Sequence, residues 1–159
     1  MSKHLYSNYN YYISMSNVQQ VQIKNSKGEL IGELRGKSVT TTIKEITHFG
    51  VRIASNATGQ FTGKYTASYM DTVNISLNRD GTAQYEFKAI QNTMEGDFVI
   101  VTSRGDGKSA GPTTMGFEGE VAFMTQSQKL GWLNTTKGWI EGTANNATGE
   151  VQVKIYAQK

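Results

Sequence analysis

Three carboxylates fall in step with apolar residues in stretches where polar and apolar side chains alternate. They are Asp71 near Val73 and Ile75, Glu45 near Val39 and Ile43, and Glu141 near Trp139. Residues two apart on a β-strand point to the same face. A carboxylate on a buried face must be paired, hydrogen-bonded or neutral, and one in a cavity could act as a general acid or base. Asp71, Glu45 and Glu141 are therefore the catalytic candidates. The alternative is that each lies near a strand end or pairs with a basic residue (Arg52, Lys64 or Arg104).

Five aromatic residues could form the walls of a ligand pocket. An aromatic ring with a polar tip suits a pocket that is mostly apolar but fixes the orientation of its ligand. The same residues could equally belong to the core. The predicted ligand-binding residues are Tyr65, Tyr69, Tyr85, Trp132 and Trp139.

The composition excludes several kinds of site. The chain has no Cys, which removes disulfides, zinc–thiolate sites, iron–sulfur clusters and cysteine nucleophiles. Its two histidines, His4 and His48, have no spacing that defines a metal site, and no Gly-x-Ser-x-Gly elbow accompanies them. We therefore expect neither a metal nor a cofactor.

The Gly-rich stretch RGDGKS at 104–109 has some features of a phosphate-binding loop. That loop needs a Gly five residues before Gly107, where Thr102 stands, and it needs a helix to follow. Here a strand-like segment follows instead. The stretch is therefore predicted to be a hairpin loop and not a nucleotide site.

Net charge is +3, and the basic residues are spread along the chain. Without a basic cluster, we do not expect nucleic-acid binding, and a single-strand binder is the weakest of the functional hypotheses. No stretch approaches the roughly 18 apolar residues of a membrane-spanning helix, and no apolar run of signal-peptide length opens the chain. We expect a cytoplasmic protein, although a mature chain without its leader would look the same.

Residues 18–159 show a period of two that is interrupted by turn sequences. The clearest turns are NRDG at 78–81 and MEGD at 94–97, and SNATG at 55–59 and NNATG at 145–149 have similar composition. No stretch of ten residues has helical periodicity. The pattern predicts an all-β domain, a single antiparallel and largely up-and-down barrel of about eight to ten strands. Residues 1–17, rich in Tyr and Asn, are predicted to be a flexible tail.

One connection, 129–137, does not read as a strand or a tight turn. It carries Trp132 and Leu133, apolar side chains that need burial. We expect this segment to fold over one end of the barrel or into a subunit interface.

The last third of the chain resembles small uncharacterised β-barrel proteins of the allene-oxide-cyclase-like and dirigent-like group. The resemblance is carried by GFEG at 116–119, KLGWLN at 129–134 and GWIEG at 138–142. It implies an eight-stranded antiparallel barrel, often oligomeric, with a ligand cavity along its axis. No catalytic motif of these families can be carried over to this sequence.

Two functions follow from these patterns. The first is a barrel that binds a small apolar molecule or assembles into a homo-oligomer. The second is a cofactor-free isomerase or cyclase that uses the carboxylates named above. The sequence alone leaves open whether the protein is an enzyme.

Overall fold

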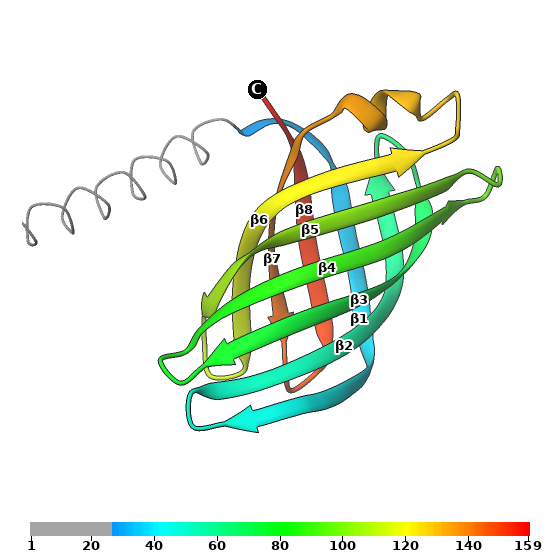
Figure 1. Cartoon of the computed structure of the whole chain (residues 1–159). Coiled ribbons are helices and arrows are strands. Elements are labelled where there is room, and N and C mark those ends of the chain that lie inside the picture. Colours follow the sequence, from blue (N-terminus) through cyan, green and yellow to red (C-terminus); the bar gives the residue numbers. More distant parts are fainter. Residues whose placement is uncertain (1–26) are drawn as a thin grey trace, which may run out of the picture.

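The computed structural model describes residues 27–159, which form an antiparallel barrel closed by eight strands (Figure 1). The strands are β1 (Lys27–Thr47), β2 (Gly50–Gly63), β3 (Ala67–Asn78), β4 (Thr82–Thr93), β5 (Phe98–Ser109), β6 (Thr114–Thr125), β7 (Gly138–Asn145) and β8 (Glu150–Gln158). A 3₁₀ helix, η1 (Gly131–Thr135), lies between β6 and β7. The predicted all-β, up-and-down barrel is confirmed. The predicted tail, 1–17, lies outside the described residues.

Each strand pairs with its neighbour in sequence, and pairing of β1 with β8 closes the barrel. The β1–β8 contact runs from Lys27 opposite Gln158 to Lys37 opposite Glu150. Closure satisfies the backbone groups that a long meander would leave at its two edges. The segment of β1 beyond Ser38 continues with only β2 beside it.

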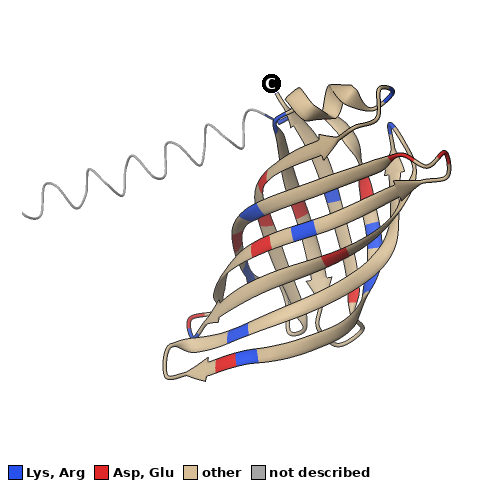
Figure 2. Cartoon of the chain, turned by 45° about the vertical axis from the view of Figure 1, so that its right-hand side comes forward, with Lys and Arg blue, Asp and Glu red and all other residues tan. Residues whose placement is uncertain are grey.

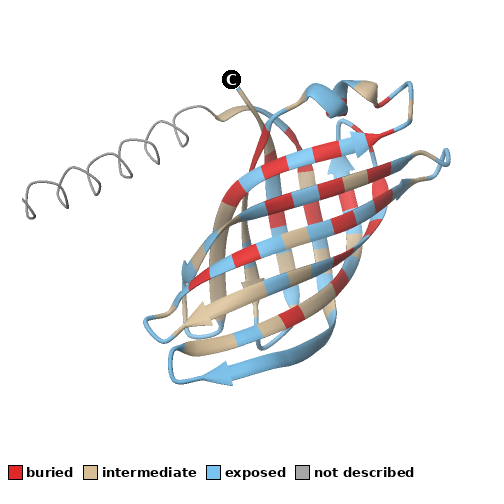
Figure 3. Cartoon of the chain, in the orientation of Figure 1, coloured by how far each residue is buried: buried red, intermediate tan, exposed pale blue. Residues whose placement is uncertain are grey.

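The barrel is packed solid at one end and more open at the other. Buried and exposed residues alternate along most strands, and the buried ones gather toward the end that carries η1 (Figure 3). The packed end contains fully buried side chains such as Ile31, Phe61, Val99 and Leu133. Along β3 the inward residues change from buried Ala67 to half-buried Leu77. The interior therefore opens toward the end formed by the β3–β4 turn.

The segment 129–137 covers the packed end, as the sequence predicted (Figure 1). Leu130 and Leu133 are buried and belong to the hydrophobic core. The Asn134 side chain accepts from the Thr125 backbone N–H at 2.8 Å and donates to the Thr125 carbonyl at 2.9 Å. Trp132 is 38% exposed and lies beneath the Lys64 ammonium, 5.4 Å from the ring centroid.

Two segments that were predicted to be turns or loops are instead parts of strands. Residues 55–59 lie in β2 and residues 104–109 lie in β5. None of the glycines in these segments has a positive φ, so they do not reverse the chain. Gly59 faces Gly36, and Gly105 faces Gly119, across adjacent strands. Glycine serves there to let backbone and rings approach closely, a use that composition does not distinguish from a turn.

Two inward-facing glycines, Gly36 and Gly119, leave room for tyrosine rings, and we call these two positions the glycine seats. A Cβ on Gly36 would lie on the Tyr69 hydroxyl, and a Cβ on Gly119 would lie 2.2 Å from the Arg104 carbonyl and 2.5 Å from the Tyr85 hydroxyl. The absence of side chains at these two positions lets Tyr69 and Tyr85 lie across the interior.

We expect Gly119→Ala to lower the free energy of unfolding by about 2 kcal/mol, because the new methyl group overlaps a backbone carbonyl that cannot move easily. Urea denaturation measures the change. Gly131→Ala is the matched control, because a Cβ there meets nothing within 4 Å, and it should be neutral or slightly stabilising. Equal effects of the two substitutions would contradict this account of the glycine seats.

Candidate ligand cavity

A cavity of about 130 Å³ occupies the open half of the barrel interior. Its walls come from the inward faces of all eight strands and are almost entirely apolar. Lining side chains include Ile53, Val73, Ile75, Phe117, Ile140 and Val151. An engineered cavity of about 150 Å³ in another protein binds benzene, so this volume suits one ring or a short alkyl group. A larger ligand would extend through the open end.

Asp71 lies at the inner end of this cavity. It is 8% exposed and is the last fully buried inward residue of β3 before the half-buried Val73 and Ile75. The Ala57 backbone N–H donates to Asp71 Oδ1 at 3.1 Å. Among residues 27–159 it is the only buried charged residue. Burial raises the pKa of Asp71 to about 7, and the Ala57 hydrogen bond opposes this only partly.

Other polar groups are buried in the barrel interior. The Tyr69 hydroxyl and Gln91 Nε2 are buried without a hydrogen-bond partner in the described part of the chain. The Tyr65 hydroxyl donates to Gln91 Oε1. The Tyr85 hydroxyl and Ser103 Oγ are 3.2 Å apart. Of these groups only the Tyr85 hydroxyl lines the cavity, so it is the one that could donate to a ligand oxygen. Burial raises the pKa of Tyr85 to about 12, which keeps this phenol protonated.

The structure does not bring the three candidate carboxylates together. Asp71 shares the inward face of β3 with Val73 and Ile75, as its spacing predicted. Glu45 does not share a face with Ile43, because a bulge between them breaks the alternation, and its carboxylate is 3.6 Å from Arg52. Glu141 lies on the outer face of β7 and forms a 2.6 Å ion pair with Lys27.

The five candidate aromatic residues are also dispersed. Tyr85 is the one that lines the cavity. Tyr69 is buried against the glycine seat, and Tyr65 stacks on Phe61 in the packed end, with ring centroids 4.6 Å apart. Trp132 lies on η1, and Trp139 is buried beside the outward residues of β6 and β8. Of these five aromatic residues, Tyr85 is therefore the one placed to contact a ligand in the cavity.

Several residues that line the cavity were not among those predicted from the sequence. Leu34 and Ala57 contact the inner part of the cavity, and Met115 and Ala144 lie toward its mouth. Met115 and Phe117, two residues apart in β6, share its inward face. Nothing in the spacing showed that the cavity would lie at that end of the strand, because this depends on where η1 closes the barrel.

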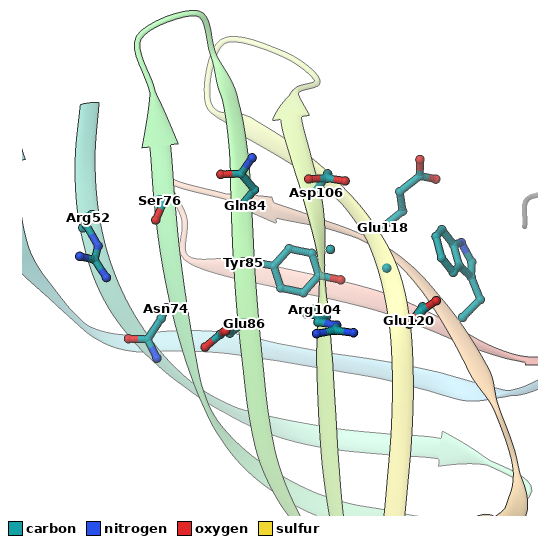
Figure 4. Close-up of a pocket in the computed structure, with 13 residues that line it drawn as sticks. Arg52, Asn74, Ser76, Gln84, Tyr85, Glu86, Arg104, Asp106, Glu118 and Glu120 are labelled. Carbon is teal, nitrogen blue, oxygen red and sulfur yellow. The ribbon is translucent and has the colours of Figure 1, made fainter. Parts of the chain in front are cut away.

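A second hollow lies on the outside of the barrel, across β2 to β7 (Figure 4). It is wider, about 570 Å³, and open to solvent. Charges of opposite sign are neighbours there, as for Glu86, Arg104 and Glu120, which face one another across β4, β5 and β6. Both signs are spread along the strands of the whole barrel in the same way (Figure 2). This hollow is a solvated sheet face, and the interior cavity is the better candidate site.

Comparisons with known proteins show the fold alone. No protein-family description and no curated protein matches the sequence. A protein of unknown function from Clostridium acetobutylicum has a similar structure, with a TM-score of 0.74 and 13% identity over 82% of this chain and 97% of its own. A β-barrel-like protein from Acinetobacter baumannii has a TM-score of 0.67 and 18% identity, over 82% of this chain and 94% of its own. An enzyme from Penicillium herquei has a TM-score of 0.61 and 19% identity, over 80% of this chain and 92% of its own.

No helix among residues 27–159 is long and apolar enough to cross a membrane.

Proposed function

We propose that the barrel binds a small apolar molecule in its interior cavity. The observation that carries the proposal is an apolar pocket, open at one end, with a single carboxyl at its inner end. Apolar walls supply affinity, and one polar group fixes orientation. The ligand is expected to contain a ring-sized apolar group with one hydroxyl or carbonyl that reaches Asp71.

Toluene and p-cresol test this proposal, because they differ only by one hydroxyl. We expect both to shift the methyl NMR signals of Val73 and Ile75, and we expect p-cresol to bind about tenfold more tightly because its hydroxyl can hydrogen-bond to Asp71. The expectation fails if neither compound shifts these signals.

A cavity-filling substitution gives a second prediction. Ile75→Trp should fill the pocket and weaken toluene binding by at least about tenfold, because the indole occupies the volume that the ligand needs. Met70→Trp is the matched control, since Met70 lies on the outer face of the same strand and is already exposed. Thermal unfolding of both variants checks that the fold is retained. If Ile75→Trp binds toluene as well as the control does, the ligand site lies elsewhere.

The second candidate function is a cofactor-free isomerase or cyclase. It is supported by Asp71, whose pKa of about 7 suits proton transfer near neutral pH. Tyr85 is a candidate for a neutral donor to a substrate oxygen, since it lines the same cavity. The resemblance to allene-oxide-cyclase-like and dirigent-like barrels and the enzyme from Penicillium herquei point the same way, at the level of fold.

Native mass spectrometry of the protein purified from its source would separate these candidates. A retained ligand identifies the occupant of the cavity. The Asp71→Asn variant then shows whether this molecule is only bound or is also converted. A binding protein would keep affinity within a few-fold, whereas an enzyme would still bind the ligand but lose turnover. Self-association and a cytoplasmic location also remain proposals. Self-association is supported by large apolar side chains exposed on the β1–β2 hairpin.

A further inference from the structure

Within residues 27–159, the second half of β1 has a neighbouring strand on one side only. Pairing with β8 stops at Lys37 opposite Glu150, where the Ser38 N–H donates to the Gly149 carbonyl at 2.8 Å. β1 continues to Thr47, and within the described chain it pairs there only with β2 (Figure 1). We name 39–47 the free edge. Its outward backbone N–H and C=O groups are available to another strand.

The composition of the free edge favours pairing with a strand. It reads VTTTIKEIT, and all of its residues except Lys44 and Glu45 are β-branched. It contains no proline and no glycine, which would weaken a ladder. Natural edges are usually blunted by charge, proline or bulges. Here bulges at Val39 and Lys44 are present, yet the strand continues past both of them.

The same hairpin exposes apolar side chains. Ile43 is 64% exposed, Ile46 is 71% exposed and Phe49 at the turn is 85% exposed. Ile43 pairs with Ile53, which lines the cavity, and Ile46 pairs with Val51 on the same face. The apolar inner surface of the barrel therefore extends past its rim onto the hairpin. Exposed apolar surface next to a free edge marks an interaction site.

We propose that the free edge pairs antiparallel with the free edge of a second copy, about a two-fold axis between Lys44 and Glu45. This inference names the surface for the self-association proposed above and is independent of the ligand. With that axis, Lys44 of each copy lies opposite Glu45 of the other, and Ile43 lies opposite Ile46. Opposite charges and aliphatic pairs are favourable across strands, and each pair occurs twice. The edge is thus complementary to itself.

Two other arrangements fit the observations less well. A lipid surface would contact the exposed isoleucines, but hydrocarbon cannot satisfy the unpaired backbone groups of the edge. A second apolar stripe runs across β3 to β6 on the outer face, through Met70, Ile90, Ile100 and Met124. Its strands are paired on both sides, so a partner there would gain side-chain contacts alone.

Charge exchange tests the axis. Sedimentation equilibrium of the full chain should show a dimer for the wild type. Lys44→Glu and Glu45→Lys should each weaken the dimer by about tenfold, because like charges then face each other twice. An equimolar mixture of the two variants should restore the affinity, since all cross-pairs become opposite in sign. Glu45 contacts Arg52 only through an exposed ion pair, so its loss costs little.

Ile43→Lys should weaken the dimer by about a hundredfold, whereas Met124→Lys, the same change at an exposed residue of the outer stripe, should leave it unchanged. Circular dichroism checks that each variant is folded. The inference is overturned if the wild type is a monomer at millimolar concentration. It is also overturned if Ile43→Lys leaves the dimer affinity unchanged, or if the mixture of the two charge variants does not regain the wild-type affinity. A monomer that binds phosphatidylserine vesicles through Ile46 and Phe49 would assign the surface to lipid. Toluene binding by a monomeric variant shows that the ligand proposal stands independently.

Discussion

Asp71→Asn should make the protein more stable at pH 8, by about 4 kcal/mol. The wild-type carboxylate is then ionised in an apolar cavity with one backbone N–H as its partner. The amide has nearly the same shape and can keep that position without a charge. Most substitutions of buried residues destabilise, so a gain of this size would be diagnostic. Urea denaturation at pH 8 and at pH 4 measures it.

The sign of the pH dependence follows from the two pKa values of Asp71. The folded pKa of about 7 lies above the ordinary value of 3.8, so between these pH values the folded state holds a proton that the unfolded state has released. The free energy of unfolding should therefore fall as pH rises from about 4 to about 7, by roughly 4 kcal/mol in total. Asp71→Asn should remove this slope and match the wild type at pH 4.

An exposed acid provides the control for this experiment. Glu86→Gln should change stability by less than about 0.5 kcal/mol and should leave the pH slope intact, because Glu86 is exposed on the outer face of β4. The account would be contradicted if Asp71→Asn lowered stability at pH 8 and the variant kept the same pH slope as the wild type. That result would show that Asp71 is ionised and well solvated in the folded protein.

Leu133→Ala should destabilise the barrel by about 3 kcal/mol. Leu133 is fully buried and holds η1 over the packed end of the interior. Its removal leaves a cavity between η1 and the barrel that the anchored Asn134 prevents from collapsing. Thermal or urea unfolding measures the loss.

Trp132→Ala is the neighbouring comparison for Leu133→Ala. Trp132 is larger but partly exposed, and its defined contact is with the Lys64 ammonium. We expect Trp132→Ala to lower the free energy of unfolding by only about 1 kcal/mol. The reverse order, with Trp132→Ala the more damaging, would mean that η1 is held by the exposed ring and not by the buried leucine.

The period of two and the turns at 78–81, 94–97 and 145–149 were enough to predict the barrel. They set strand length and the inward face, and they placed Asp71 in step with Val73 and Ile75. The same rule misplaced Glu45, because a single extra residue in β1 reverses the face of everything after it. Local spacing contains no sign of such a bulge.

Glycine use was the second obstacle to prediction. The segment 55–59 has turn composition but lies within β2, because Gly59 faces Gly36 and leaves room for the ring of Tyr69. That requirement comes from a strand more than twenty residues away and from a ring in the next strand. The free edge depends similarly on where β8 ends, which is a property of the closed barrel.

The central claim is that Asp71 is a buried carboxyl at the inner end of a cavity that accepts an apolar ligand. Carbon-13 NMR titration of the Asp71 side-chain carboxyl, with and without toluene, tests both parts of this claim together. We predict a pKa of about 7 in the free protein and a higher one when toluene excludes water from the cavity. A pKa near 4 that toluene leaves unchanged would contradict the claim.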